Sequence, residues 1–219
     1  MTLIALYLTA YVGTGREPYR PEVAWVRAGI WSTVCWLGSV TSGSFERLVT
    51  EPDASANGRG STAWLALAAA AAATLLGGRW VLWRRAFGHG DRPAQPGVSA
   101  AFGVVWGVCT GQWIVVIFDA VAGLGVPGSA QWIVTSVASI AWVTGFHHWF
   151  WHPVVLPERP DPAAGRAAWL LGDVPAIAIT CAFLVFTEDR MSTVALFTMA
   201  FVPQAFAIRM PAPWNRAPA

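Results

Sequence analysis

Seven apolar runs divide this 219-residue chain, and charged or Pro/Gly-rich stretches separate them. Six of the runs reach or approach the roughly 20 residues that a helix needs to cross a bilayer. Only 12% of the residues are charged, about half the fraction of a soluble domain. The sequence therefore predicts an all-α integral membrane bundle with one transmembrane domain over residues 1–219. The expected spans are approximately 1–14, 22–44, 62–82, 98–122, 129–152, 167–187 and 191–208.

The first run, MTLIALYLTAYVGT, decides between seven spans and six. It has no basic region before it and no small-residue cleavage site, so it fits a short span better than a signal peptide. Of the fourteen arginines, eleven follow odd-numbered spans. This positive-inside bias predicts an N-terminus outside, a C-terminus in the cytoplasm and a multi-pass protein of the inner cell membrane. The alanine-rich run within 62–82 is expected to pack closely inside the bundle.

The composition excludes several classes of protein. All basic residues except the four histidines are arginine, so neither a retinal Schiff base nor a lysine nucleophile is available. The small net charge of +2 is spread over loops, which argues against nucleic acid as a partner. Cys35, Cys109 and Cys181 are dispersed in apolar runs and are interpreted as small core residues. Membrane lipids and an apolar small molecule are the expected partners, with a homo-oligomer or a second membrane subunit as further candidates.

Three histidines of the segment GFHHWFWHPVV fall at the predicted cytoplasmic end of the fifth span. His148 and His152 are four residues apart and share a helix face, whereas His147 is rotated by about 100°. Asp173 is expected about one turn inside the same level, at the start of the sixth span. Two imidazoles and a facing carboxylate could bind iron, copper or zinc. The alternatives are an aromatic belt at the lipid headgroups and a proton-transfer or headgroup-binding site.

A second polar level is predicted at the outer ends of the spans. Asp119 lies near the outer end of the fourth span, and Glu46 lies near the same boundary. Either could protonate an isoprenoid double bond beside aromatic rings that stabilise a carbocation. Glu188 and Asp189 are expected to be solvated boundary charges. The residues expected to line a substrate cavity are Trp36, Trp106, Gln112, Trp113 and Trp142.

Three functions follow as hypotheses. The first is a membrane enzyme or enzyme subunit that oxidises a lipid-soluble substrate at a site of His148, His152 and Asp173, assisted by His147. The second is a metal-free isoprenoid cyclase that uses Asp119 or Glu46 as its acid. The third is a transporter or structural membrane subunit without catalysis. Aspartate-rich prenyltransferase motifs, desaturase histidine boxes and a phosphatase signature are all missing from the sequence.

Overall fold

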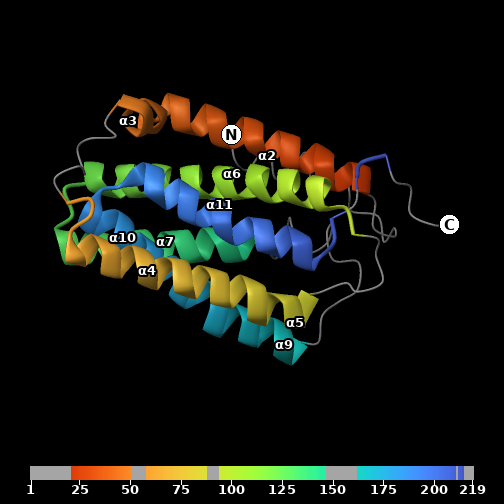
Figure 1. Cartoon of the computed structure of the whole chain (residues 1–219). Coiled ribbons are helices and arrows are strands. Elements are labelled where there is room, and N and C mark those ends of the chain that lie inside the picture. Colours follow the sequence, from red (N-terminus) through yellow and green to blue (C-terminus); the bar gives the residue numbers. More distant parts are fainter. Residues whose placement is uncertain (1–20, 51–57, 88–93, 147–161, 211, 215–219) are drawn as a thin grey trace.

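The structure is a computed structural model that describes residues 21–50, 58–87, 94–146, 162–210 and 212–214. All regular secondary structure within these residues is helical (Figure 1). The all-α prediction is therefore confirmed for the described part of the chain. The first expected span, residues 1–14, and residues 147–152 of the fifth lie outside the described residues.

Six of the expected spans correspond to helical segments that begin within five residues of the predicted start. The first segments are α2 (Pro21–Thr41), the short α3 (Ser44–Thr50), and a continuous run of α4 (Thr62–Gly77), η1 (Gly78–Trp83) and α5 (Arg84–Phe87). The later ones are α6 (Pro96–Gly123), α7 (Gly128–Phe146), α9 (Pro162–Ala167), η3 (Ala168–Asp173), α10 (Val174–Thr187) and α11 (Arg190–Ala207). The label η denotes a π-helical segment.

Local chemistry sets where several helices begin. The Ser61 hydroxyl caps α4 by accepting a hydrogen bond from the backbone N–H of Trp64 at 3.2 Å, and Asp189 caps α11 in the same way. Such caps satisfy backbone donors that the first helical turn leaves free. Pro96 occupies the first turn of α6, where a missing N–H costs nothing. Between α10 and α11, Glu188 adopts a left-handed conformation with φ of 54°, so the chain reverses within two residues.

The long helices run in alternating directions along one bundle (Figure 1). α6 packs against α2, α7 and α11, while α10 packs against α4 and α7. Residues near the start of α2, the end of α4–α5 and the start of α9 therefore lie at one end of the bundle. The α3 helix and the turn between α10 and α11 lie at the other end.

Three glycines of α6, spaced four residues apart, let the backbone of α11 approach closely. A Cβ atom at Gly103, Gly107 or Gly111 would lie 2.6, 2.4 or 2.7 Å from a Cα atom of α11. The facing residues are Val202, Thr198 and Val194. Small residues at this spacing favour tight helix packing in membranes, because lipid removes most of the hydrophobic gain from association. The spacing is visible in GVVWGVCTG, but only the tertiary structure identifies α11 as the partner.

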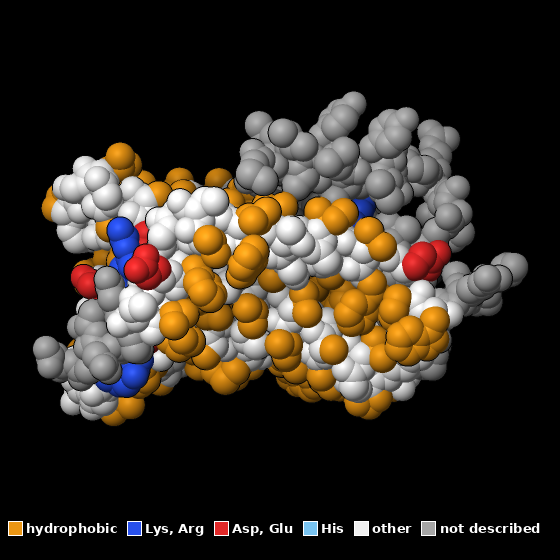
Figure 2. Space-filling model, turned by 90° about the horizontal axis from the view of Figure 1, so that it is seen from above, with side chains coloured by type: hydrophobic (Ala, Val, Ile, Leu, Met, Phe, Trp, Pro, Cys, Tyr) orange, Lys and Arg blue, Asp and Glu red, His pale blue; other side chains and the backbone are white. Residues whose placement is uncertain are grey.

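Three helices among the described residues are long and apolar enough to cross a membrane, namely Thr62–Ala86, Pro96–Gly123 and Ala163–Thr187. In the face shown in Figure 2, hydrophobic side chains cover the middle of the molecule and the charged side chains lie toward its ends. A middle zone without charges is what contact with hydrocarbon requires. The chain is accordingly a membrane protein, built as a helical bundle.

The alanine-rich helix α4 lies on the outside of the bundle, so the expectation that it packs in the interior is wrong. Only Ala71 and Leu75 of α4 are buried, and Leu65 remains 53% exposed. Small apolar side chains cover every face of α4. The sequence pattern therefore cannot indicate which face contacts α10 and α11. In a membrane the other faces meet lipid, which is as apolar as they are.

Candidate functional site

Polar side chains of the described helices gather at two ends, which we call the arginine-rich end and the acidic end. At the arginine-rich end lie Arg27, Arg84, Arg85, Arg166 and Arg209. At the acidic end lie Glu46, Arg47, Arg59, Asp119, Glu188, Asp189 and Arg190. Each end is assembled from several helices. Asp119 and Glu46, predicted at one level, both lie at the acidic end, whereas the histidines of the other predicted level lie outside the described residues.

Asp173 is a buried carboxylate in the half of the bundle that leads to the arginine-rich end. Its residue surface is only 5% exposed. The helix that carries it begins at Pro162, five residues before the predicted start, so Asp173 lies about three turns from the helix start. The predicted start of this segment is therefore wrong by five residues, whereas the depth of Asp173 relative to the histidines stays a prediction. The polar, proline-rich composition before residue 167 conceals the first turns of this helix.

The backbone at Asp173 is π-helical rather than α-helical. Asp173 is the last residue of η3, and Pro175 follows it in the first turn of α10. Proline lacks an N–H donor, and its ring crowds the carbonyl of the residue four positions earlier. A π-helical turn accommodates both effects by shifting the hydrogen-bonding register. The π-helical segment η3 therefore ends directly before the turn that contains Pro175.

A second π-helical segment packs against the first. A Cβ atom added to Gly78 of η1 would lie only 3.0 Å from the Cα atom of Gly172 in η3. The two backbones therefore touch directly beside Asp173. π-Helical turns are rare and are frequently found at functional sites, which makes this contact the most unusual backbone feature near a buried carboxylate.

The end of α7 reaches the same region. The indole Nε1 of Trp169, in η3, donates a hydrogen bond to the hydroxyl of Thr144 at 2.8 Å. Trp132 of α7 likewise donates to the carbonyl oxygen of Ala178 in α10, at 2.9 Å. The fifth and sixth segments are thus neighbours, as expected for helices joined in sequence.

The histidines follow Thr144 in the sequence but lie outside the described residues. These are His147, His148 and His152, and His89 is outside as well. Among the residues that the structure describes, no group of three His, Cys, Asp or Glu side chains could hold a metal ion. The metal site of His148, His152 and Asp173, with iron, copper or zinc, therefore stays a prediction.

At the acidic end, Asp119 is paired with arginines from two other helices. Its Oδ1 accepts hydrogen bonds from Arg190 Nη2 at 2.9 Å and Nε at 3.2 Å, and Arg47 Nη1 lies 3.6 Å away. The Arg190 guanidinium also lies over the ring of Phe118, 5.3 Å from its centroid. Asp119 itself is buried, whereas Glu46 is exposed. This arrangement joins α6, α3 and α11 through one carboxylate.

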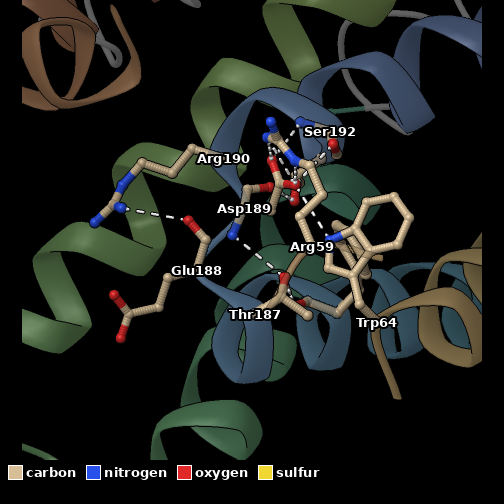
Figure 3. Close-up of polar contacts among 9 residues, drawn as sticks. Arg59, Trp64, Thr187, Glu188, Asp189, Arg190 and Ser192 are labelled. Carbon is tan, nitrogen blue, oxygen red and sulfur yellow. Dashed lines mark hydrogen bonds and ion pairs between the residues drawn. The ribbon is translucent and has the colours of Figure 1, made fainter. Parts of the chain in front are cut away.

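Asp189 is a fully buried hydrogen-bond centre, so its expected place among the solvated boundary charges is wrong (Figure 3). Arg59 donates to its two carboxylate oxygens from Nε at 3.0 Å and Nη2 at 3.1 Å. Trp64 Nε1 donates at 3.2 Å, and the backbone N–H and hydroxyl of Ser192 complete the set. Both oxygens are thus used to tie the segment before α4 to the start of α11. Glu188, its neighbour, is exposed as predicted.

Four tryptophans form one aromatic cluster between α2, α6 and α7. The ring of Trp31 lies 6.4 Å from Trp106, 5.8 Å from Trp113 and 5.8 Å from Trp142. Trp113 and Trp142 are 5.2 Å apart. This tryptophan cluster contains three of the five residues expected to line a cavity, and its centre, Trp31, was not among them.

The other two expected cavity residues lie outside the tryptophan cluster. Trp36 is 53% exposed on α2, and Gln112 is half-buried on α6. The signal that would have identified Trp31 is its depth, since it lies near the middle of an apolar span that neighbours the one carrying Trp106 and Trp113. Trp36 lies five residues further along α2, which places it on the opposite helix face.

Comparisons with known proteins identify no relative for this chain. No protein-family model matches it, and neither the curated proteins nor the solved structures contain a significant match. Functional inference therefore depends on the residues and contacts described above.

Proposed function

We propose that the chain is a small enzyme or enzyme subunit of the inner membrane that acts on a lipid-soluble apolar substrate at Asp173. The observation that carries this proposal is a buried carboxylate at the contact of two π-helical segments. Ionisable side chains within transmembrane segments are rare, and each is a candidate functional residue. Membrane lipids surround the site in this proposal, and a second copy or another membrane subunit would contact the exposed helix faces.

The proposed topology has seven spans, with the N-terminus outside and the C-terminus in the cytoplasm. The gathering of Arg84, Arg85, Arg166 and Arg209 at one end of the described bundle supports this orientation. Arginine-rich loops remain on the cytoplasmic side of inner membranes. The arginine-rich end would therefore face the cytoplasm, and the Asp173 site would be reached from that half of the bilayer.

The proposed chemistry is metal-dependent oxidation. His148 and His152 would bind iron, copper or zinc together with Asp173, and His147 would orient the site. The hydrogen bond from Trp169 to Thr144 supports this grouping, because it holds the chain that leads into the histidines beside η3. The apolar part of the substrate would lie along the rings of Trp106, Trp113 and Trp142, with Gln112 nearby and Trp36 facing lipid.

Acid-initiated isoprenoid cyclisation is the second candidate, with less support. A general acid must hold a proton that it can give to the substrate. Asp119 Oδ1 instead accepts hydrogen bonds from Arg190 and lies 3.6 Å from Arg47 Nη1, so two guanidinium groups already engage this carboxylate. Glu46 is exposed and so has no apolar enclosure. The remaining candidate is a transporter or structural subunit without turnover.

Elemental analysis of the purified protein tests the metal. Wild type, the His148→Ala/His152→Ala double variant and a His89→Ala control would be purified in detergent and assayed for iron, copper and zinc. We expect near-stoichiometric metal in wild type and in the control, and loss of most of it in the double variant. Equal metal content in wild type and the double variant would exclude the proposed ligands.

The lipids of producing cells test the reaction. Lipid extracts from cells with wild type, Asp173→Asn or Asp119→Asn would be compared by mass spectrometry. If the protein oxidises a lipid, the wild-type extract should contain a lipid that has gained oxygen or lost two hydrogen atoms. This product should be absent with Asp173→Asn and present with Asp119→Asn. A wild-type lipid of unchanged mass but altered chromatographic retention, which Asp119→Asn abolishes and Asp173→Asn retains, would favour the cyclase, because proton-initiated ring closure neither adds nor removes atoms overall. Identical extracts from wild type and both variants would indicate a subunit without turnover.

A further inference from the structure

Two of the three cysteines meet inside the bundle although they are far apart in the sequence. Cys35 of α2 and Cys109 of α6 are 0% and 5% exposed, and both are free thiols. The Cys109 thiol lies 3.3 Å from the hydroxyl of Ser32 across the α2–α6 interface, and Cys35 lies one turn after Ser32 on the same face of α2. This placement makes the two thiols neighbours inside the bundle. The sequence predicts two small core residues and gives no sign that they meet.

Only short side chains separate α2 from α6 at this level, where Cys109 Sγ meets Ser32 Oγ at 3.3 Å. Gly38, three residues after Cys35, leaves room for the ring of Trp113, which would lie 2.6 Å from a Cβ atom there. Ser32, Cys35 and Gly38 thus present a small-residue face of α2 to α6. Short side chains in contact keep the two backbones near each other, and a disulfide needs Cα atoms within about 7 Å of each other.

The surroundings of the thiol pair are apolar and aromatic. Trp31 lies four residues before Cys35, while Trp106 and Trp113 flank Cys109 at helical spacing. These three rings belong to the tryptophan cluster. A reagent that reaches the thiols must therefore dissolve in hydrocarbon, which excludes charged water-soluble thiol reagents as the natural oxidant.

We propose that Cys35 and Cys109 are a redox-active pair that closes to a disulfide within the membrane and is oxidised by a lipid-soluble quinone. Both S–H bonds break and one S–S bond forms. The two electrons and two protons pass to the quinone, which becomes the hydroquinone. A quinone fits because it carries both electrons and protons through hydrocarbon as a neutral molecule. Closure would covalently join α2 to α6 beside the tryptophan cluster.

Cys181 provides an internal control. It is buried on α10, and its polar neighbours are Ser136 and Ser139 of α7. Thiols can form or exchange a disulfide only where the sulfur atoms can reach each other. Oxidation of the proposed pair should therefore leave Cys181 as a free thiol.

The test uses full-length protein in lipid nanodiscs under anaerobic conditions, incubated with decylubiquinone or decylubiquinol. The protein is denatured, free thiols are blocked with N-ethylmaleimide, and peptides are analysed by mass spectrometry without reduction. We expect a peptide linked through Cys35 and Cys109 in most molecules after quinone, with hydroquinone formed in equal amount. After quinol we expect both thiols to be alkylated.

Variants assign the reaction to this pair. Cys181→Ala should retain the linked peptide, whereas Cys35→Ala and Cys109→Ala should lose both the link and hydroquinone formation. The His148→Ala/His152→Ala variant should also retain the link, so a failure here is distinguishable from a failure of the proposed metal site. Alkylation of both thiols in quinone-treated wild type, or a link that involves Cys181, would overturn the proposal.

Discussion

At the scale of single residues, the acidic end depends on buried carboxylates that distant arginines satisfy. Asp189 and Asp119 are 1% and 6% exposed, and each accepts hydrogen bonds from an arginine of another segment. A buried charge is strongly destabilising when its partner is removed. The two carboxylates differ in how many of their oxygens accept hydrogen bonds. Both oxygens of Asp189 do, whereas Asp119 Oδ2 is buried without a hydrogen bond from any described residue.

We expect Asp189→Ala to lower the free energy of unfolding by about 2 kcal/mol, because it removes the cap of α11 and leaves the indole N–H of Trp64 without its acceptor. Glu188→Ala is the matched control, since its side chain is exposed on the neighbouring residue. Thermal unfolding in detergent, followed by tryptophan fluorescence, measures both. Equal melting temperatures for the two variants would contradict a structural role for Asp189.

At the scale of elements, packing is decided by where backbones can touch. The glycines of α6 bring α11 close along three turns, and Gly78 and Gly172 bring η1 against η3. Both contacts join helices through backbone atoms rather than through large side chains. Such contacts tolerate little added volume, because overpacking forces the surrounding backbone to move.

Gly107→Ala should destabilise the protein by about 2 kcal/mol, because its Cβ atom would lie 2.4 Å from the Cα atom of Thr198. Gly123→Ala, at the other end of α6, meets no atom within 4 Å. Alanine has the higher helix propensity at both sites, so the pair separates steric clash from propensity. The comparison of the two unfolding temperatures is the measurement. A Gly107→Ala protein as stable as Gly123→Ala would argue against tight α6–α11 packing.

At the scale of the whole molecule, charged residues are distributed unequally between the two ends of the bundle. The face in Figure 2 is apolar in its middle. The two charged ends differ in composition, with arginines dominating one and carboxylates balancing arginines at the other. A difference of this kind determines which end an inner membrane retains in the cytoplasm. The proposed orientation therefore makes a prediction about each end.

Labelling of introduced cysteines tests the orientation. Thr50→Cys, at the end of α3, should react with a membrane-impermeant maleimide in intact cells, whereas Arg85→Cys in α5 should react only after the cells are permeabilised. Both parent residues are exposed, and the three native cysteines are buried. Unmodified protein supplies the background. Labelling of Arg85→Cys, but not Thr50→Cys, in intact cells would reverse the proposed topology.

The sequence by itself determined six helical segments of the described chain and their approximate starts. Apolar run length, capping residues and prolines act within a few residues of each other, so they can be read locally. The same reasoning placed Asp119 near a helix end and selected Trp106, Trp113 and Trp142 as residues far from the helix ends. It placed the start of the segment that carries Asp173 five residues too late, because arginines and prolines before residue 167 conceal a helix that begins at Pro162.

Only the tertiary structure decided which of these residues meet. The burial of Asp189, the choice of α11 as the partner of Gly107 and the meeting of Cys35 with Cys109 all join segments distant in the sequence. In a membrane chain nearly every helix face is apolar, so hydrophobic periodicity cannot select a partner face as it does in water. Close backbone approach and the pairing of buried charges make that choice, and both depend on the assembled bundle.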